Sequence, residues 1–242
     1  FKCPASFRIF ACQNPTQQGG GRKGLPKSFL NRFTQVYIEQ FESEDLLFIA
    51  SAMFPELPCS LLEKMIEFNT RMYEDSMLHG KFARKGSPWE FNLRDIFRWC
   101  SLIRNYTPTV LLEQQHFPSM AQQASRFVDL IYLQRMRTIS DREYIQNVFH
   151  EIFGFHLIQY TNPQYHLTAE SLQIGFATLA VNQRSTRTSR SNLQILPGQL
   201  HTLENVMKCI EMNWMVILLG SAGSGKTSVV QLLSQLTGTS LH

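Results

Sequence analysis

Apolar residues in the central part of the chain recur at the spacing of amphipathic helices. Ser43 precedes two acidic residues, which predicts an N-cap for a helix that ends near Met53, before Pro55. A second helix is predicted further on, because apolar residues return at intervals of three, four or seven. Its apolar stripe comprises Leu61, Leu62, Met65, Ile66, Met72 and Tyr73.

The same signals predict three more helices. They run from Asn92, from Ser119 to Arg137, and from Ser140 to Phe153. The first has Asp95 three residues after Asn92, and the last combines a capping box, Ser140-x-x-Glu143, with a closing Gly154. The pattern therefore predicts a helical domain over residues 41–155.

Extended structure is predicted near both ends of the chain. Phe7–Cys12 and Thr34–Ile38 have the pattern of short strands. Trp214–Leu219 is a continuous apolar run, which is typical of a buried strand in a parallel sheet. A helix that starts at Leu196 and continues through Ile210 is expected to lead into this run.

Residues 156–195 alternate short apolar stretches with turn residues and end in the polar run 182–192, so they predict an exposed linker. Arg184, Arg187 and Arg190 lie there among hydroxyl side chains and could contact RNA phosphates. The charges are few and no aromatic residues are interleaved with them, which favours a solvated loop. We therefore predict no direct, specific binding of nucleic acid.

The motif that carries chemistry follows the apolar run. It reads Gly220-Ser221-Ala222-Gly223-Ser224-Gly225-Lys226-Thr227, a complete G-x-x-x-x-G-K-T phosphate loop. Its glycines let successive N–H groups point at phosphate oxygens, at the start of a helix expected over residues 227–236. Lys226 would reach the β- and γ-phosphates and Thr227 would offer its hydroxyl to Mg²⁺. The motif predicts a site for ATP or GTP with Mg²⁺.

Hydrolysis also needs an acidic residue on a second strand, and none follows Thr227. Upstream, Asp129 falls inside a helical pattern, and Glu44 and Asp45 precede an apolar run instead of ending one. The order of the parts therefore indicates the end of one domain joined to the start of another.

Two N-terminal motifs support this arrangement: Phe10-Ala11-Cys12-Gln13-Asn14-Pro15 and Leu25-Pro26-Lys27-Ser28-Phe29-Leu30-Asn31-Arg32-Phe33. With them the sequence resembles the AAA+ ATPases, most closely the giant dynein-like ring ATPases of ribosome assembly and more distantly the MoxR group. The chain departs from the family pattern at Cys12, where Thr is common, and at Asn31, where Asp is common.

The resemblance implies roles for three further residues. Asn14 would be sensor 1, Arg32 the arginine finger offered to a neighbouring module, and Arg94 the second sensor at the start of a lid helix. From the residues alone, Asn14 could equally belong to an ordinary turn, and each arginine could be an ordinary surface residue. Asn14 and Arg94 would serve a different nucleotide from the one bound at Gly220–Thr227.

The implied fold class is α/β, made of AAA+ P-loop NTPase pieces. Residues 1–40 would end one core, 41–155 would form its helical lid, 156–195 would link two modules, and 196–242 would begin the next core. The absence of an initiator Met also suggests an excised segment.

The amino-acid composition agrees with this interpretation and excludes several other classes of protein. Hydrophobic residues make up 43% and the formal net charge is +4, which fits an intracellular globular protein and is too small to imply nucleic-acid binding. The cysteines lack C-x-x-C spacing, so reduced thiols are favoured over a disulfide or zinc framework. No signal peptide and no membrane-length apolar run is found in the sequence.

The resemblance implies an ATPase that uses ATP to remove assembly factors from pre-60S ribosomal particles in the nucleolus and nucleoplasm. Its partners would be other AAA+ modules of the same ring, the pre-60S particles and their assembly factors, with no membrane partner. Two alternatives remain: a non-catalytic nucleotide-binding scaffold segment of the ring, or a MoxR-like maturation chaperone. The isolated chain is expected to bind nucleotide weakly and to hydrolyse it negligibly.

Overall fold

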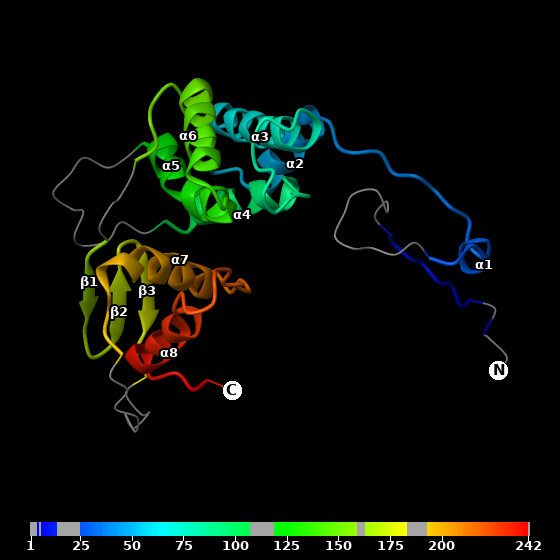
Figure 1. The fold of residues 1–242 in the computed structure, drawn as a ribbon. Helices are drawn as coiled ribbons and strands as arrows, with labels where there is room; N and C mark the ends of the chain where they lie inside the picture. The colour runs from blue at the N-terminus through cyan, green and yellow to red at the C-terminus, as the bar shows by residue number, and fades with distance from the viewer. Residues whose placement is uncertain are drawn as a thin grey trace.

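The computed structural model describes residues 4, 6–13, 25–106, 119–158, 163–182 and 193–241. Its buried residues form two hydrophobic clusters. The first is helical and the second combines a small sheet with two helices, whereas the N-terminal segment extends away from both (Figure 1). The α/β fold class expected from the sequence is confirmed.

The first cluster, called the helical cluster below, is built from helices that cover residues 43–153. In chain order they are α2 (Ser43–Met53), α3 (Cys59–Tyr73), the π-helical turn η2 (Glu74–Leu78), α4 (Leu93–Arg104), α5 (Met120–Ile131), the 3-10 turn η4 (Leu133–Arg135) and α6 (Ile139–Phe153). The apolar stripe predicted on the second helix faces inward in α3, where its members are buried or half-buried. Helical periodicity therefore located these elements correctly.

The helix caps agree with the sequence in part. Asn92 caps α4 and Ser119 caps α5, and Gly154 ends α6 in the left-handed conformation. At α6 the predicted capping box is wrong, because Thr138, not Ser140, accepts the hydrogen bond from the backbone N–H of Asp141. The carboxylate of Asp141 also accepts the N–H of Ala83, so a tertiary contact selects Asp141 as the third helical residue.

Two further helix ends differ from the expectation. Ser43 lies inside α2, and Glu42 before it forms the capping box with Asp45. The helix predicted over 119–137 ends at Ile131, and the 3-10 turn η4 follows after Tyr132, whose ring is buried. The Tyr132 hydroxyl donates to Oδ1 of Asn69 at 2.9 Å, which satisfies both polar groups inside the core.

Aromatic rings fill the centre of the helical cluster. Phe68 of α3 makes edge-on contacts with Trp99 of α4, with Tyr132 and with Phe149 of α6, at centroid distances of 5.0–5.8 Å. These four side chains are fully buried. The indole N–H of Trp99 donates to the carbonyl of Ala124 in α5 at 2.8 Å, so the ring is held by both packing and a hydrogen bond.

A buried carboxylate joins α3 and η2 to α6. Asp75 accepts hydrogen bonds from Arg71 at 2.6 Å and from the hydroxyl of Tyr144 at 2.9 Å, and it pairs with Lys81 at 2.6 Å. Burial alone would raise the pKa of Asp75, but the hydrogen bonds from Lys81, Arg71, Tyr144 and His79 outweigh it and hold the pKa well below the usual range. Asp75 is therefore ionised inside the fold.

The second cluster contains a three-stranded antiparallel sheet, in the order β1 (Tyr165–Leu167), β2 (Ser171–Ile174) and β3 (Ala177–Ala180). The 3-10 turn η5 (Pro197–Gln199), α7 (Leu200–Glu211) and α8 (Lys226–Thr237) pack with it. In Figure 1, α7 lies between the helical cluster and α8. The sheet falls within the region expected to be a linker, and residues 183–192 of that region lie outside the described residues.

Three predicted strands do not form in the described structure. Phe7–Cys12, Thr34–Ile38 and the run 214–219 before the phosphate loop have no regular secondary structure. Met215 and Ile217 expose 97% and 83% of their surface, so this run is not buried. The reason is that a parallel strand is buried only by neighbouring strands and covering helices, which the described residues do not supply.

The second N-terminal motif, residues 25–33, contains a short helix, α1 (Lys27–Leu30), followed by a turn. The rings of Phe29 and Phe33 lie 5.2 Å apart across this turn. Among the described residues, no helix has the length and apolarity that crossing a membrane requires.

Candidate functional site

The phosphate loop curls at the start of α8 because two of its glycines take left-handed backbone angles. Gly223 and Gly225 have φ values of +78° and +80°, and Gly225 is the residue that precedes the helix. An L side chain is strained in this conformation, so glycine is required at both positions. The first N–H groups of α8 therefore point into the loop, which creates a favourable position for an anion.

Close packing also restricts the side chains possible at positions 220 and 225. A Cβ at Gly220 would lie 2.8 Å from Oγ of Ser224, across the loop. A Cβ at Gly225 would lie 2.9 Å from the amide nitrogen of Gln199, the last residue of η5. The loop is thus closed by its own serine on one side and contacts the start of α7 on the other.

Lys226 directs its ammonium group back over the loop. Its Nζ donates to the carbonyl oxygens of Gly220 at 3.0 Å and Ser221 at 2.7 Å, and lies 3.3 Å from Oγ of Ser224. Thr227 is exposed in the first turn of α8. The N–H groups, the ammonium and the hydroxyl form a donor set that fits a nucleotide polyphosphate with Mg²⁺. No group of three or more metal-ligating side chains occurs among the described residues.

The predicted sensor and finger residues lie elsewhere. Asn14 is outside the described residues. Arg32 is exposed in the turn after α1, and Figure 1 shows α1 far from α8, where the phosphate loop begins. Arg94 is exposed in the first turn of α4 and lines a shallow groove with Trp214. The roles of these three residues therefore remain predictions.

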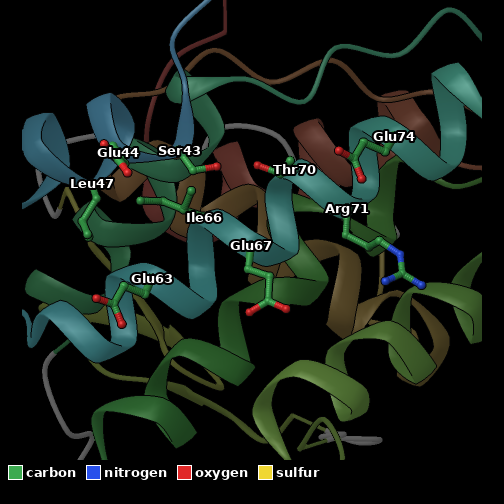
Figure 2. Close-up of a pocket in the computed structure, with 9 residues that line it drawn as sticks. All are labelled: Ser43, Glu44, Leu47, Glu63, Ile66, Glu67, Thr70, Arg71 and Glu74. Carbon is green, nitrogen blue, oxygen red and sulfur yellow. The ribbon is translucent and has the colours of Figure 1, made fainter.

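A second groove lies between α2 and α3, on the helical cluster (Figure 2). Leu47 and Ile66 form part of its wall, and the side chains of Glu63 and Glu67 come from the same face of α3. Carboxylates of this kind repel phosphate groups, so this groove is unsuited to a nucleotide. Of the features described here, the loop before α8 is therefore the one that fits a phosphate group.

The sequence analysis missed a group of polar residues where the helical cluster meets the second cluster. Asp129 of α5 lies 2.8 Å from Nε2 of His201 in α7 and accepts a hydrogen bond from the amide of Asn205 at 3.0 Å. On the other side of the ring, Nδ1 of His201 lies 3.4 Å from the buried carboxylate of Glu204. Glu204 also accepts the backbone N–H of Phe176 at 3.0 Å. We call these five residues the junction.

The junction could not be inferred from spacing, because Asp129 and Phe176 lie far along the chain from their partners in α7. The hydrogen bond to Asp129, together with the negative charges of Asp129 and Glu204, raises the pKa of His201 to about 10. Burial would raise the pKa of Asp129, but the bond to His201 and the charge of that ring lower it. Both groups are therefore charged near neutral pH. The helical placement of Asp129 itself was predicted and is confirmed.

A helical lid followed by a phosphate loop defines a segment of an AAA+ protein. The family model described as Midasin AAA lid domain matches residues 45–156, which is the helical cluster. A curated relative named Midasin from Dictyostelium discoideum is 48% identical over 264 residues, which cover 100% of this chain and 4% of the relative. Midasin from Giardia intestinalis is 31% identical over 258 residues, covering 97% of the chain and 5% of the relative. The chain belongs to the midasin family.

This membership confirms the resemblance to large, dynein-like AAA+ proteins that the N-terminal motifs and the phosphate loop indicated. The helical cluster is called the lid from here on. Because the chain spans only a few per cent of each relative's length, the activity and partners of the whole protein are matters for proposal.

Proposed function

We propose that the chain is part of an ATP-driven AAA+ ring that remodels and releases assembly factors from pre-60S ribosomal particles in the nucleus. The observation that carries the ATP part of this proposal is the phosphate loop, in which Lys226 turns back onto Gly220 and Ser221 at a helix N-terminus. The ribosomal part rests on membership of the midasin family and on the resemblance to ring ATPases of ribosome assembly.

The residues of the loop have distinct tasks in this proposal. The backbone N–H groups at the start of α8 bind and orient the phosphates, and the Lys226 ammonium neutralises the β- and γ-phosphate oxygens. The hydroxyl of Thr227 would hold Mg²⁺, which supplies charge neutralisation when bound. Arg32 would stabilise charge on a nucleotide of a neighbouring module, while Asn14 and Arg94 would serve the nucleotide of their own module.

The test is Lys226→Ala in the full-length protein, with Lys85→Ala as the matched control. Lys85 is an exposed lysine on the lid and has no assigned role. We expect Lys226→Ala to lower ATP turnover by at least tenfold, because removing a preorganised cationic contact typically costs about two to three orders of magnitude in rate. Sedimentation with pre-60S particles should shift in parallel, since factor release would stall.

The same experiment distinguishes the scaffold alternative. Unchanged turnover together with a weaker ring, measured by gradient sedimentation of the variant, would reject catalysis at this site and favour a structural nucleotide. Normal ATP turnover and a normally sedimenting ring in Lys226→Ala would reject both the catalytic and the structural role of this site. Loss of activity in Lys85→Ala as well would indicate a general folding defect and would also count against the proposal.

A further inference from the structure

The imidazole of His201 lies between two carboxylates that come from different parts of the fold. Asp129 belongs to α5 of the lid, while Glu204 belongs to α7 and is only 1% exposed. Each ring nitrogen faces one carboxylate, at 2.8 Å and 3.4 Å respectively. A neutral imidazole can donate through one nitrogen alone, whereas the charged ring can donate to both. The arrangement therefore suits a charged ring that links the two helices.

The turn between β2 and β3 completes the junction. Glu204 accepts the N–H of Phe176, and the ring of Phe176 lies 5.4 Å from that of Phe127 in α5. Gly175 has a φ of +54°, and a Cβ there would come within 1.8 Å of Glu204 Oε1. The carboxylate thus occupies the space that a side chain at position 175 would fill. Lid, hairpin turn and α7 are fixed together at one point.

The far end of α7 is also held to the lid. Trp214, three residues beyond α7, packs against the lid core, and the guanidinium of Arg98 in α4 lies 5.3 Å from its ring centroid. At the near end, the side chain of Gln199, two residues before His201, lies beside Gly225 of the phosphate loop, because a Cβ added at Gly225 would be 2.9 Å from its amide nitrogen. The helix that precedes the phosphate loop therefore contacts the lid at both ends and the loop at one.

We propose that His201 is a positioning residue: by joining Asp129 of the lid to Glu204 of α7, it fixes the phosphate loop of one AAA+ module relative to the lid of the module before it. The inference rests on the proposed function only in taking the loop as a nucleotide site. A displacement of the lid would then reach the loop through α7 and Gln199 as a change in loop geometry. Coupling of this kind is established only by perturbing both partners.

The experiment uses full-length protein with His201→Gln, Asp129→Asn and the double variant, and His166→Gln as the control. His166 is an exposed histidine on β1, in the same cluster. Backbone amide exchange is followed by mass spectrometry. We expect each single variant to speed exchange in peptides from α7 and the phosphate loop by about tenfold, because local opening becomes easier. The effect of the double variant should be smaller than the sum of the two single effects, since both substitutions remove the contact between His201 and Asp129.

Amide exchange measured over a range of pH values gives a second test, because a merely structural role of His201 would not make the protection of α7 depend on pH. The titratable groups that face the His201 ring are Asp129 from α5 and Glu204 from α7 itself. The pKa of His201 is raised from 6.5 to about 10, so its stabilising contribution is complete below 6.5 and is lost as pH rises through 10. After correction for intrinsic exchange, protection of α7 should fall across this window in wild type and stay flat in His201→Gln.

Several outcomes would overturn the inference. Unchanged exchange in the loop, additive effects in the double variant, or lost protection in α3 and α6 as well would each exclude a local positioning role. The result is separable from the test of function, because amide exchange does not depend on turnover. Inactivity of Lys226→Ala with no effect of His201→Gln would reject the junction alone, and the reverse would reject the proposed ATPase site alone.

Discussion

The lid and the second cluster show how differently two regions of one chain use their apolar residues. In the lid, helices close around the aromatic centre of Phe68, Trp99 and Tyr132, which are completely buried. In the second cluster, Met215, Ile217 and Leu219 expose most of their surface beside a well-formed phosphate loop. A helix needs only one covered face, whereas a strand of a parallel sheet needs neighbours on both edges and cover on both faces. Helical regions are therefore completed locally, and parallel sheets are not.

The largest effect that should distinguish the two regions is truncation of a core residue. Trp99→Ala removes a buried ring and its hydrogen bond to Ala124, and we expect it to lower the free energy of unfolding by about 3–5 kcal/mol. Ile217→Ala should change it by less than about 0.5 kcal/mol, because 83% of Ile217 is exposed. Urea unfolding followed by circular dichroism measures both. Equal losses would contradict the comparison.

A smaller effect should come from Asp75, the buried carboxylate that joins α3 and η2 to α6 in the lid. Asp75→Asn keeps the shape but removes the charge that binds Arg71 and Lys81, and should cost about 2 kcal/mol. The pKa of Asp75 is lowered in the fold, so its contribution is present above the unfolded pKa and is lost as pH falls below it. Stability of the wild type should therefore decline below about pH 4 more steeply than that of the variant. If the stability of the wild type and of Asp75→Asn changed in parallel with pH, the stabilising role of the Asp75 charge would be rejected.

The smallest effect tests the start of α6. Thr138→Ala should lower stability by about 1 kcal/mol, because the hydroxyl accepts the N–H of Asp141 at the helix start. Ser140→Ala should be nearly neutral, since Ser140 lies inside the helix and not at its cap. Thermal unfolding of both variants checks the assignment. A larger loss for Ser140→Ala would restore the capping box expected from the sequence.

The sequence predicted the helices of the lid because their signals are local. Asn92 and Ser119 cap helices through residues two or three positions away, and such pairs can be read directly from spacing. The cap of α6 was misassigned because Ala83, far away in the chain, fixes Asp141. The strands were overpredicted because alternation reports the tendency to pair but not whether a partner is present. Long-range contacts therefore decided the cap of α6 and the unpaired strands, whereas the start of α2 depends on a local capping box between Glu42 and Asp45.

The same difference between local signals and long-range contacts explains which parts of the candidate site could be predicted. The phosphate loop could be recognised from the sequence because its residues are contiguous and each has a defined chemical task. His201 and Asp129 gave no signal, because neither has a motif and their contact joins two helices from different clusters. The sensor and finger roles were inferred by resemblance and remain predictions, because the nucleotides on which these residues would act need ligands from other parts of a ring.

The contact between Gly175 and Glu204 also limits which substitutions these two positions can accept during evolution. The space beyond the glycine Cα is taken by the carboxylate, so the two positions share a single volume although they lie on different elements. A larger residue at position 175 fits only if Glu204 is first replaced by a smaller residue. Even then, the φ of +54° at position 175 would strain any residue other than glycine. Among relatives, these positions are expected to be inherited as a pair, with glycine the last of the two to change.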